Sequence, residues 1–182
     1  HMELILLINS KKYNFDWNAG LEGACQGGHS DIVEYLISKG VSNWTRGFIG
    51  ACRGGHMNTL LIMMFQADIL NYRLDLDLGL STACLRGNVD VVEYIITKAD
   101  KSNIVLNLNH ALGIACCTNN VGLVELLIQK GADNYNRGLY NACSGGSMET
   151  ASLMISKGAD NFKECLNVVK GDELYKLLES KN

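Results

Sequence analysis

The stretch GACQGGHSDIVEYLISKG, residues 23–40, holds the pattern that decides the fold. A near copy, GACRGGHMNTLLIMMF, occupies residues 50–65. The pair Ala-Cys recurs along the chain at Ala24-Cys25, Ala51-Cys52, Ala83-Cys84, Ala115-Cys116 and Ala142-Cys143. Successive copies are 27, 32, 32 and 27 residues apart, and self-similarity at such periods is the signature of a repeat protein.

A second marker, Asn or Asp followed by an aromatic residue, recurs in phase with the first. Its copies are Asp16-Trp17, Asn43-Trp44, Asn71-Tyr72, Asn134-Tyr135 and Asn161-Phe162. The two markers predict one continuous solenoid domain. Its expected parts are a partial N-terminal repeat or cap at 2–15, repeats at 16–42, 43–70, 71–102, 103–133 and 134–160, and a C-terminal cap at 161–182.

Each repeat is predicted to hold two helices. The first is short and rich in small residues, at about 20–26 in the first repeat, and the second carries apolar residues at helical spacing. Between them stands a Gly or Asn, which tolerates the left-handed conformation that ends a helix: Gly28, Gly55, Gly87, Asn119 and Gly146. Because one helix pair cannot bury its apolar face alone, the pattern predicts an all-α solenoid of stacked helix-turn-helix repeats.

The segments GGHSDIVEYLISKGVSN and GGSMETASLMISKGADN resemble the second helix and trailing loop of the ankyrin repeat family. The resemblance covers about residues 16–182. The chain departs from the family at the start of the first helix, where Thr-Pro-Leu-His is replaced by AGLE, RGFI, LGLS, ALGI and RGLY.

The 27-residue spacings are also shorter than the usual ankyrin period of about 33 residues. The resemblance implies that the missing residues belong to the β-hairpin finger between repeats. Only the junctions at 71–79 and 103–112 have room for fingers, and Arg73–Leu78 alternates with a strand period. We therefore expect β-hairpin fingers only at these two junctions. This short-finger style is similar to ankyrin arrays encoded by large DNA viruses of amoebae, which would make the chain a viral protein acting in a host cell.

The repeated Cys-x-Gly-Gly-His motif raises a choice between chemistry and packing. Cys25 and Cys52 are followed four residues later by histidines, but the other repeats carry Asn88, Asn120 and Ser147 at that position. A nucleophile needs a base, and a zinc site needs paired ligands such as Cys-x-x-Cys. We therefore interpret these cysteines as small core residues. We expect no catalytic residue, no metal and no cofactor, and hence no enzyme.

Composition excludes several classes of partner. The net charge of −3 gives no basic footprint for nucleic acid, and no apolar run reaches the roughly 18 to 20 residues of a membrane span. Seven cysteines without paired spacing favour a reducing compartment, so we expect an intracellular, cytoplasmic protein. We further expect a monomer with no small-molecule substrate.

The resemblance implies a protein-protein interaction scaffold that binds a partner protein through its concave face. Trp, Tyr and Arg most often carry interface energy. The candidate contact residues on the first helices and junctions are Trp44, Arg46, Arg53, Tyr72, Arg73, Arg86, Arg137 and Tyr140. As alternatives, the aromatic rings fill gaps left by short fingers and the arginines form a solvated face. The alternative function is a structural spacer or targeting scaffold segment of a larger chain.

One predicted helix is apolar all round. In Leu60–Phe65, Leu61 stands where the sister helices carry Glu34, Glu93 and Glu125. The segment Asp68–Asn71 is expected to fold over this helix. An exposed apolar patch would instead mark an interface, for example for self-association.

Overall fold

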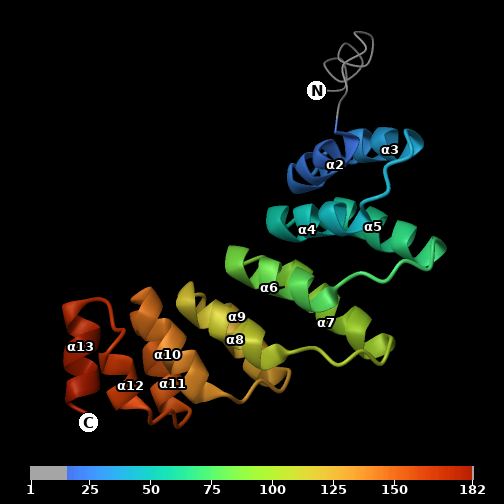
Figure 1. Ribbon diagram of the computed structural model, residues 1–182. Helices are drawn as coiled ribbons and strands as arrows, with labels where there is room; N and C mark the ends of the chain where they lie inside the picture. Colours follow the sequence, from blue (N-terminus) through green and yellow to red (C-terminus); the bar gives the residue numbers. More distant parts are fainter. Residues whose placement is uncertain (1–15, 182) are drawn as a thin grey trace. The chain divides into compact units, whose positions relative to one another are not determined.

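The computed structural model describes residues 16–181, which form helices and short loops and contain no β-strand. The chain comprises two compact units, His1–Asn103 (unit 1) and Ile104–Asn182 (unit 2). The helices of unit 1 are α2 (Trp17–Gln26), α3 (Ser30–Ser38), α4 (Trp44–Gly54), α5 (Met57–Ile69), α6 (Leu76–Arg86) and α7 (Val89–Lys101) (Figure 1). The helices of unit 2 are α8 (Leu108–Cys117), α9 (Val121–Gln129), α10 (Tyr135–Gly145), α11 (Met148–Ser156), α12 (Phe162–Leu166) and α13 (Asp172–Glu179). The partial repeat expected at 2–15 lies outside the described residues.

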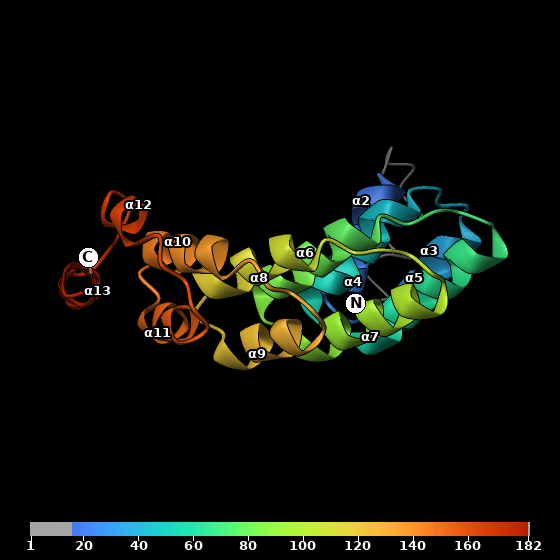
Figure 2. The ribbon, with the colours of Figure 1, turned by 90° about the horizontal axis from the view of Figure 1, so that it is seen from below.

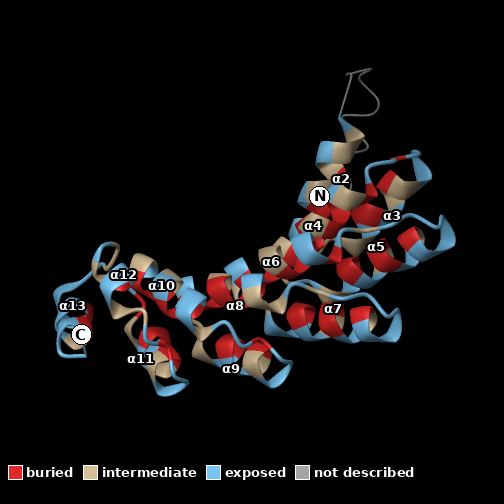
Figure 3. Ribbon diagram, turned by 60° about the horizontal axis from the view of Figure 1, so that its bottom comes forward, coloured by how far each residue is buried: buried red, intermediate tan, exposed pale blue. Residues whose placement is uncertain are grey.

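The helices pair and stack in two rows within each unit. In unit 1 the first helices α2, α4 and α6 contact one another in turn, as do the second helices α3, α5 and α7. In unit 2, α10 contacts both α8 and α12, α11 contacts α9, and α13 packs on α12 (Figure 2). Buried positions alternate with exposed ones along the helices, and the buried ones form the apolar core between the rows (Figure 3). The solenoid-type, all-helical fold is confirmed, whereas the residue boundaries of the repeats remain predictions.

Four of the five copies of the second sequence marker begin a first helix, whereas Asn71-Tyr72 lies in the loop before α6. The side chains of Asp16, Asn43 and Asn134 each accept hydrogen bonds from backbone N–H groups of the next turn, so they are N-caps, and the aromatic residue after each is the first helical residue. Because Asp16 caps the helix, α2 begins at Trp17, three residues before the expected start at residue 20.

The turn between the two helices has the expected conformation. Gly28, Gly55, Gly87 and Gly146 have φ values between 72° and 76°, and Asn119, the one residue with a side chain at this position, has φ 56°. These values lie in the left-handed region, which glycine enters without cost and asparagine tolerates. The left-handed conformation predicted for the Gly or Asn between the two helices is therefore confirmed.

The β-hairpin fingers expected at the two long junctions are not formed. The extra residues lengthen the second helices instead, because α5 and α7 have 13 residues whereas α3 and α9 have 9. Four residues make about one helical turn. In α7 the added turn buries Ala99, so the apolar seam of the second helix continues through it.

The strand-like alternation at Arg73–Leu78 was a misleading signal. Asp75 accepts a hydrogen bond from the backbone N–H of Leu78 at 2.9 Å and caps α6, which begins at Leu76. A local bond from a side chain to the backbone thus starts a helix where the period-two pattern indicates a strand.

Side-chain hydrogen bonds join repeats that lack the Thr-Pro-Leu-His start. The Oδ1 atom of Asn18 accepts from the backbone N–H groups of Ser42 and Asn43 in the next loop, at 3.2 and 2.9 Å. Asn109 and Asn136, which occupy the same position in α8 and α10, hold the loops that follow them in the same way. These asparagines fix each loop against the preceding first helix.

The last helix pair is held to the repeat before it. The backbone N–H of Lys170 donates to the carbonyl oxygen of Cys143 at 3.0 Å. Leu174 and Leu178 of α13 are buried, whereas Glu173, Lys176 and Glu179 are exposed. This amphipathic pattern suits a terminal repeat, and its capping role remains a prediction.

Candidate functional site

The repeated cysteines lie in the core. Six of the seven are buried and only Cys117 is exposed. Burial raises the pKa of Cys25, Cys84 and Cys116 to about 12, so these thiols are protonated at neutral pH and are poor nucleophiles.

The residue four positions after the cysteine packs on the preceding repeat. Asn88 Nδ2 donates to the carbonyl oxygen of Cys52 at 2.8 Å, and Ser147 Oγ donates to that of Cys117 at 2.9 Å. The imidazole of His56 lies so close to Gly28 that a Cβ there would stand 2.7 Å from the ring. The motif is therefore a junction between repeats.

The described residues contain neither a cluster of metal ligands nor a helix that could span a membrane. Within residues 16–181, no three His, Cys, Asp or Glu side chains lie close enough together to hold a metal ion. None of the helices in that range has both the length and the hydrophobicity needed to cross a membrane.

Two of the predicted arginines in unit 1 share one carboxylate. Arg46 Nε donates to Glu22 Oε2 at 3.0 Å, and Arg53 Nη1 donates to Glu22 Oε1 at 2.7 Å. Arg46 Nη1 also lies 3.5 Å from Asp16 Oδ2. Burial alone would raise the pKa of Glu22, but the hydrogen bonds from Arg53 and Arg46 outweigh it and lower the pKa. Glu22 on α2 thus ties both arginines of α4 to the preceding repeat.

The corresponding arginine of unit 2 has no such partner. Arg137 stands three residues after the N-cap of α10, as Arg46 does in α4. The preceding helix α8 carries Asn107 and Gly113 at the positions that Asp16 and Glu22 occupy in α2. Arg137 is exposed and forms no ion pair within the described range.

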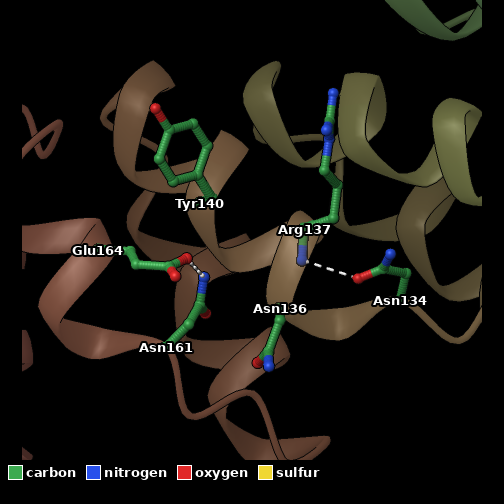
Figure 4. Close-up of a pocket in the computed structure, with 6 residues that line it drawn as sticks. All are labelled: Asn134, Asn136, Arg137, Tyr140, Asn161 and Glu164. Carbon is green, nitrogen blue, oxygen red and sulfur yellow. Dashed lines mark hydrogen bonds between the residues drawn. The ribbon is translucent and has the colours of Figure 1, made fainter.

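Two hollows open beside Arg137. The smaller has a volume of about 240 Å³ and is lined by Asn107, Asn109, His110, Asn134 and Arg137. The larger has a volume of about 520 Å³ and is lined by Asn134, Asn136, Arg137, Tyr140, Asn161 and Glu164 (Figure 4).

The side chains around the larger hollow have distinct directions. Figure 4 shows Arg137 and Tyr140 projecting from α10 to the same side. The carboxylate of Glu164 is directed toward Asn161 instead, whose Nδ2 donates to it at 3.3 Å. Arg137 and Tyr140 are therefore presented together, on a surface lined mostly by amides.

The remaining predicted contact residues are more scattered. Trp44 is only 7% exposed, so its ring belongs to the core and offers little surface to a partner. Tyr72 is exposed, and its hydroxyl is hydrogen-bonded to Thr45 Oγ1 at 3.0 Å. Arg73 and Arg86 are exposed and make no ion pair with other residues of the described chain. The structure thus brings together two pairs: Arg46 with Arg53, and Arg137 with Tyr140.

Sequence reasoning missed the polar lining of the hollows. Asn107, Asn109, His110, Asn161 and Glu164 were not among the candidates, because single amides carry no signal of binding. The signal that could have indicated this lining is an Asn that recurs at the N-cap and again two residues later, as at Asn107 and Asn109.

The fold-over expected at the apolar helix is also wrong. Asp68 and Ile69 belong to α5 itself, so they cannot cover its earlier turns. Leu61 and Phe65 are exposed among the described residues, Phe65 by 62%.

The chain is similar to known proteins in one stretch of its sequence and in its fold. Residues 107–138 match the sequence model of the ankyrin repeat. The ankyrin repeat domain of human ASB11 is similar in structure, with a TM-score of 0.64 at 20% sequence identity over 89% of this chain and 82% of that domain. A search of curated proteins found no match. Ankyrin repeats generally mediate protein–protein interactions. Residues 107–138 thus match the ankyrin repeat, and the chain has the fold of an ankyrin repeat domain.

Proposed function

We propose that this protein binds a partner protein, without catalysis, through the exposed face of its first helices, with α10 at the centre of the contact in unit 2. The observation that carries the proposal is Arg137, which is exposed and unpaired within residues 16–181 and lines both hollows. Tyr140 stands beside it and is 38% exposed. Arginine and tyrosine are the residues that most often dominate the binding energy of an interface.

The α4 face of unit 1 is a weaker candidate for the centre of the contact. Its arginines already donate to Glu22, so a partner would have to replace an existing ion pair. The net gain from such an exchange is small, because the internal pair must be broken first. Arg137 has no such pair to break.

The lining of the hollows supports recognition of a protein segment. Five asparagines contribute amides, which donate and accept hydrogen bonds. Such groups orient a bound chain.

Partner capture followed by titration tests the proposal. Immobilised protein is used to capture a partner from a cell extract, and the purified partner is titrated by calorimetry. Arg137→Ala combined with Tyr140→Ala should weaken binding by about tenfold or more, equivalent to about 1.4 kcal/mol. Glu125→Ala is the matched control, because Glu125 is exposed on the second helix α9 and lines neither hollow. Equal weakening by the control, or the lack of any saturable partner, would contradict the proposal.

A further inference from the structure

Unit 1 shows which groups bind an arginine at the position that Arg137 occupies in unit 2. Arg46 of α4 meets two carboxylates from the preceding repeat, Glu22 at 3.0 Å and Asp16 at 3.5 Å. Both acids come from α2 or its N-cap. A carboxylate therefore fits beside Arg46, where it accepts a hydrogen bond from the guanidinium.

No acidic residue lines the smaller hollow at the equivalent position beside Arg137 in unit 2. Asn107 and Gly113 stand at the positions of Asp16 and Glu22, and the smaller hollow of about 240 Å³ opens beside Asn107. Gly113 lies next to Arg137, since a Cβ on Gly113 would be 3.8 Å from Arg137 Cγ. Without an acid at either position, Arg137 faces a polar hollow.

The charge pattern around this hollow suits an anionic group. Arg137 is a permanent cation, and no acidic residue lines this hollow. Glu164 lines the larger hollow only. An entering carboxylate therefore meets amides, an imidazole and the Arg137 guanidinium, and no acidic lining residue.

We propose that the partner supplies the missing acid: an Asp or Glu side chain of a protein segment enters the smaller hollow and pairs with Arg137, as Glu22 pairs with Arg46. This proposal rests on the proposed function and names the chemistry of the partner that the α10 face selects. A hydrogen bond between charged groups is among the stronger polar contacts, so this pair would contribute to specificity.

Substitutions that restore the internal acid test the proposal directly. Asn107→Asp places a carboxylate where Asp16 stands in unit 1, and aspartate is as good an N-cap as asparagine, so α8 keeps its start. Gly113→Glu places a second carboxylate at the position that Glu22 occupies in unit 1. Its neutral control is Gly113→Gln, because both side chains must displace the amide of Asn141, which lies against Gly113.

The probe is a displayed library of random peptides, selected on the immobilised full chain. Peptides that bind the unmodified protein should be enriched in Asp and Glu. The best of them, made synthetically, should bind Asn107→Asp, Gly113→Glu and Arg137→Gln about tenfold more weakly or worse. Gly113→Gln should retain binding to within a few-fold, and circular dichroism establishes that each variant is folded.

The outcomes separate this proposal from the proposed function. Selected peptides that lack acidic residues, or that bind Asn107→Asp and Arg137→Gln unchanged, would overturn the carboxylate proposal and leave protein binding intact. If no peptide binds the unmodified protein saturably, the carboxylate proposal fails. The proposed function fails as well only if the capture experiment yields no partner.

Discussion

Helix α4 of unit 1 and helix α10 of unit 2 share the same sequence pattern but present different surfaces. Residues 43–52 read NWTRGFIGAC and residues 134–143 read NYNRGLYNAC. Both helices have 11 residues, an asparagine N-cap and a left-handed glycine after the last turn. On α4 the arginine is bound by acids of the preceding repeat, whereas on α10 it is unpaired among the described residues and faces two hollows.

This comparison shows that the polar groups a repeat exposes depend on the residues of the repeat before it. Arg46 and Arg137 occupy the same place in their own helices, and what distinguishes them is Glu22 or Gly113 on the helix before. In a stacked array each repeat contacts only its neighbours, so one substitution can close or open a binding position in the next repeat without altering the fold.

The largest difference is expected in cysteine reactivity, which probes the packing of each unit's core. Cys52 and Cys143 are buried, and burial raises the pKa of Cys143 to about 12, whereas Cys117 of α8 is exposed. When the native protein is treated with iodoacetamide, Cys117 should be alkylated at least about a hundredfold faster than Cys52 or Cys143, because buried thiols react only after local opening. Peptide mass spectrometry measures the rates, and equal rates would contradict a packed core.

Glycine substitutions should destabilise both helices to a similar extent. A Cβ on Gly54 would collide with the carbonyl oxygen of Gln26, and one on Gly145 with that of Cys117. These are backbone atoms and cannot rotate away. Gly54→Ala and Gly145→Ala should each lower the free energy of unfolding by about 1–3 kcal/mol in urea denaturation. A stabilising effect of either would show that these helices do not approach so closely.

Glu22→Gln should cost less, about 1 kcal/mol or below, because the ion pairs with Arg46 and Arg53 are partly exposed. The pKa of Glu22 is lowered in the folded state, so its contribution is fully present above the ordinary glutamate pKa of about 4.3. It is lost as the pH falls through the lower, folded-state pKa. The stability difference from the unmodified protein, measured by denaturation at several pH values, should therefore be present at neutral pH and vanish in acid. A difference that persists in acid would be due to packing.

The smallest effect is expected for Arg137→Gln. Since Arg137 forms no ion pair within residues 16–181, its loss should change the free energy of unfolding by less than about 0.5 kcal/mol. Arg46→Gln is the matched comparison and should be the more destabilising of the two. Thermal denaturation of both variants under one condition gives the ranking, and the reverse order would indicate that Arg137 has an internal partner.

Much of the fold could be predicted because its determinants are local and recur. The Ala-Cys pair marks the end of each first helix, and the Gly/Asn column after it takes the predicted left-handed conformation, as at Gly28 and Asn119. The error at Arg73–Leu78 arose because a capping aspartate between leucines also gives a period-two pattern. The pattern alone could not distinguish a longer helix α5 from a finger.

The candidate site was less accessible to sequence reasoning because it depends on contacts between repeats. Arg46 and Arg137 look equivalent as arginines three residues after an N-cap, and the acids Glu22 and Asp16 of the preceding repeat distinguish Arg46. Trp44 looked like an interface residue but fills the core. Whether a side chain is bound, buried or free is decided by residues some 24 positions away, which single-helix patterns do not contain.

The central claim is that α10, and not α4, offers an arginine to a partner. Its most direct test is calorimetric titration of the selected acidic peptide, or of a captured partner, into Arg46→Gln and Arg137→Gln in parallel. The account predicts that Arg137→Gln weakens binding by about tenfold or more and that Arg46→Gln stays within about twofold of the unmodified protein. Equal losses for the two variants, or a larger loss for Arg46→Gln, would contradict it.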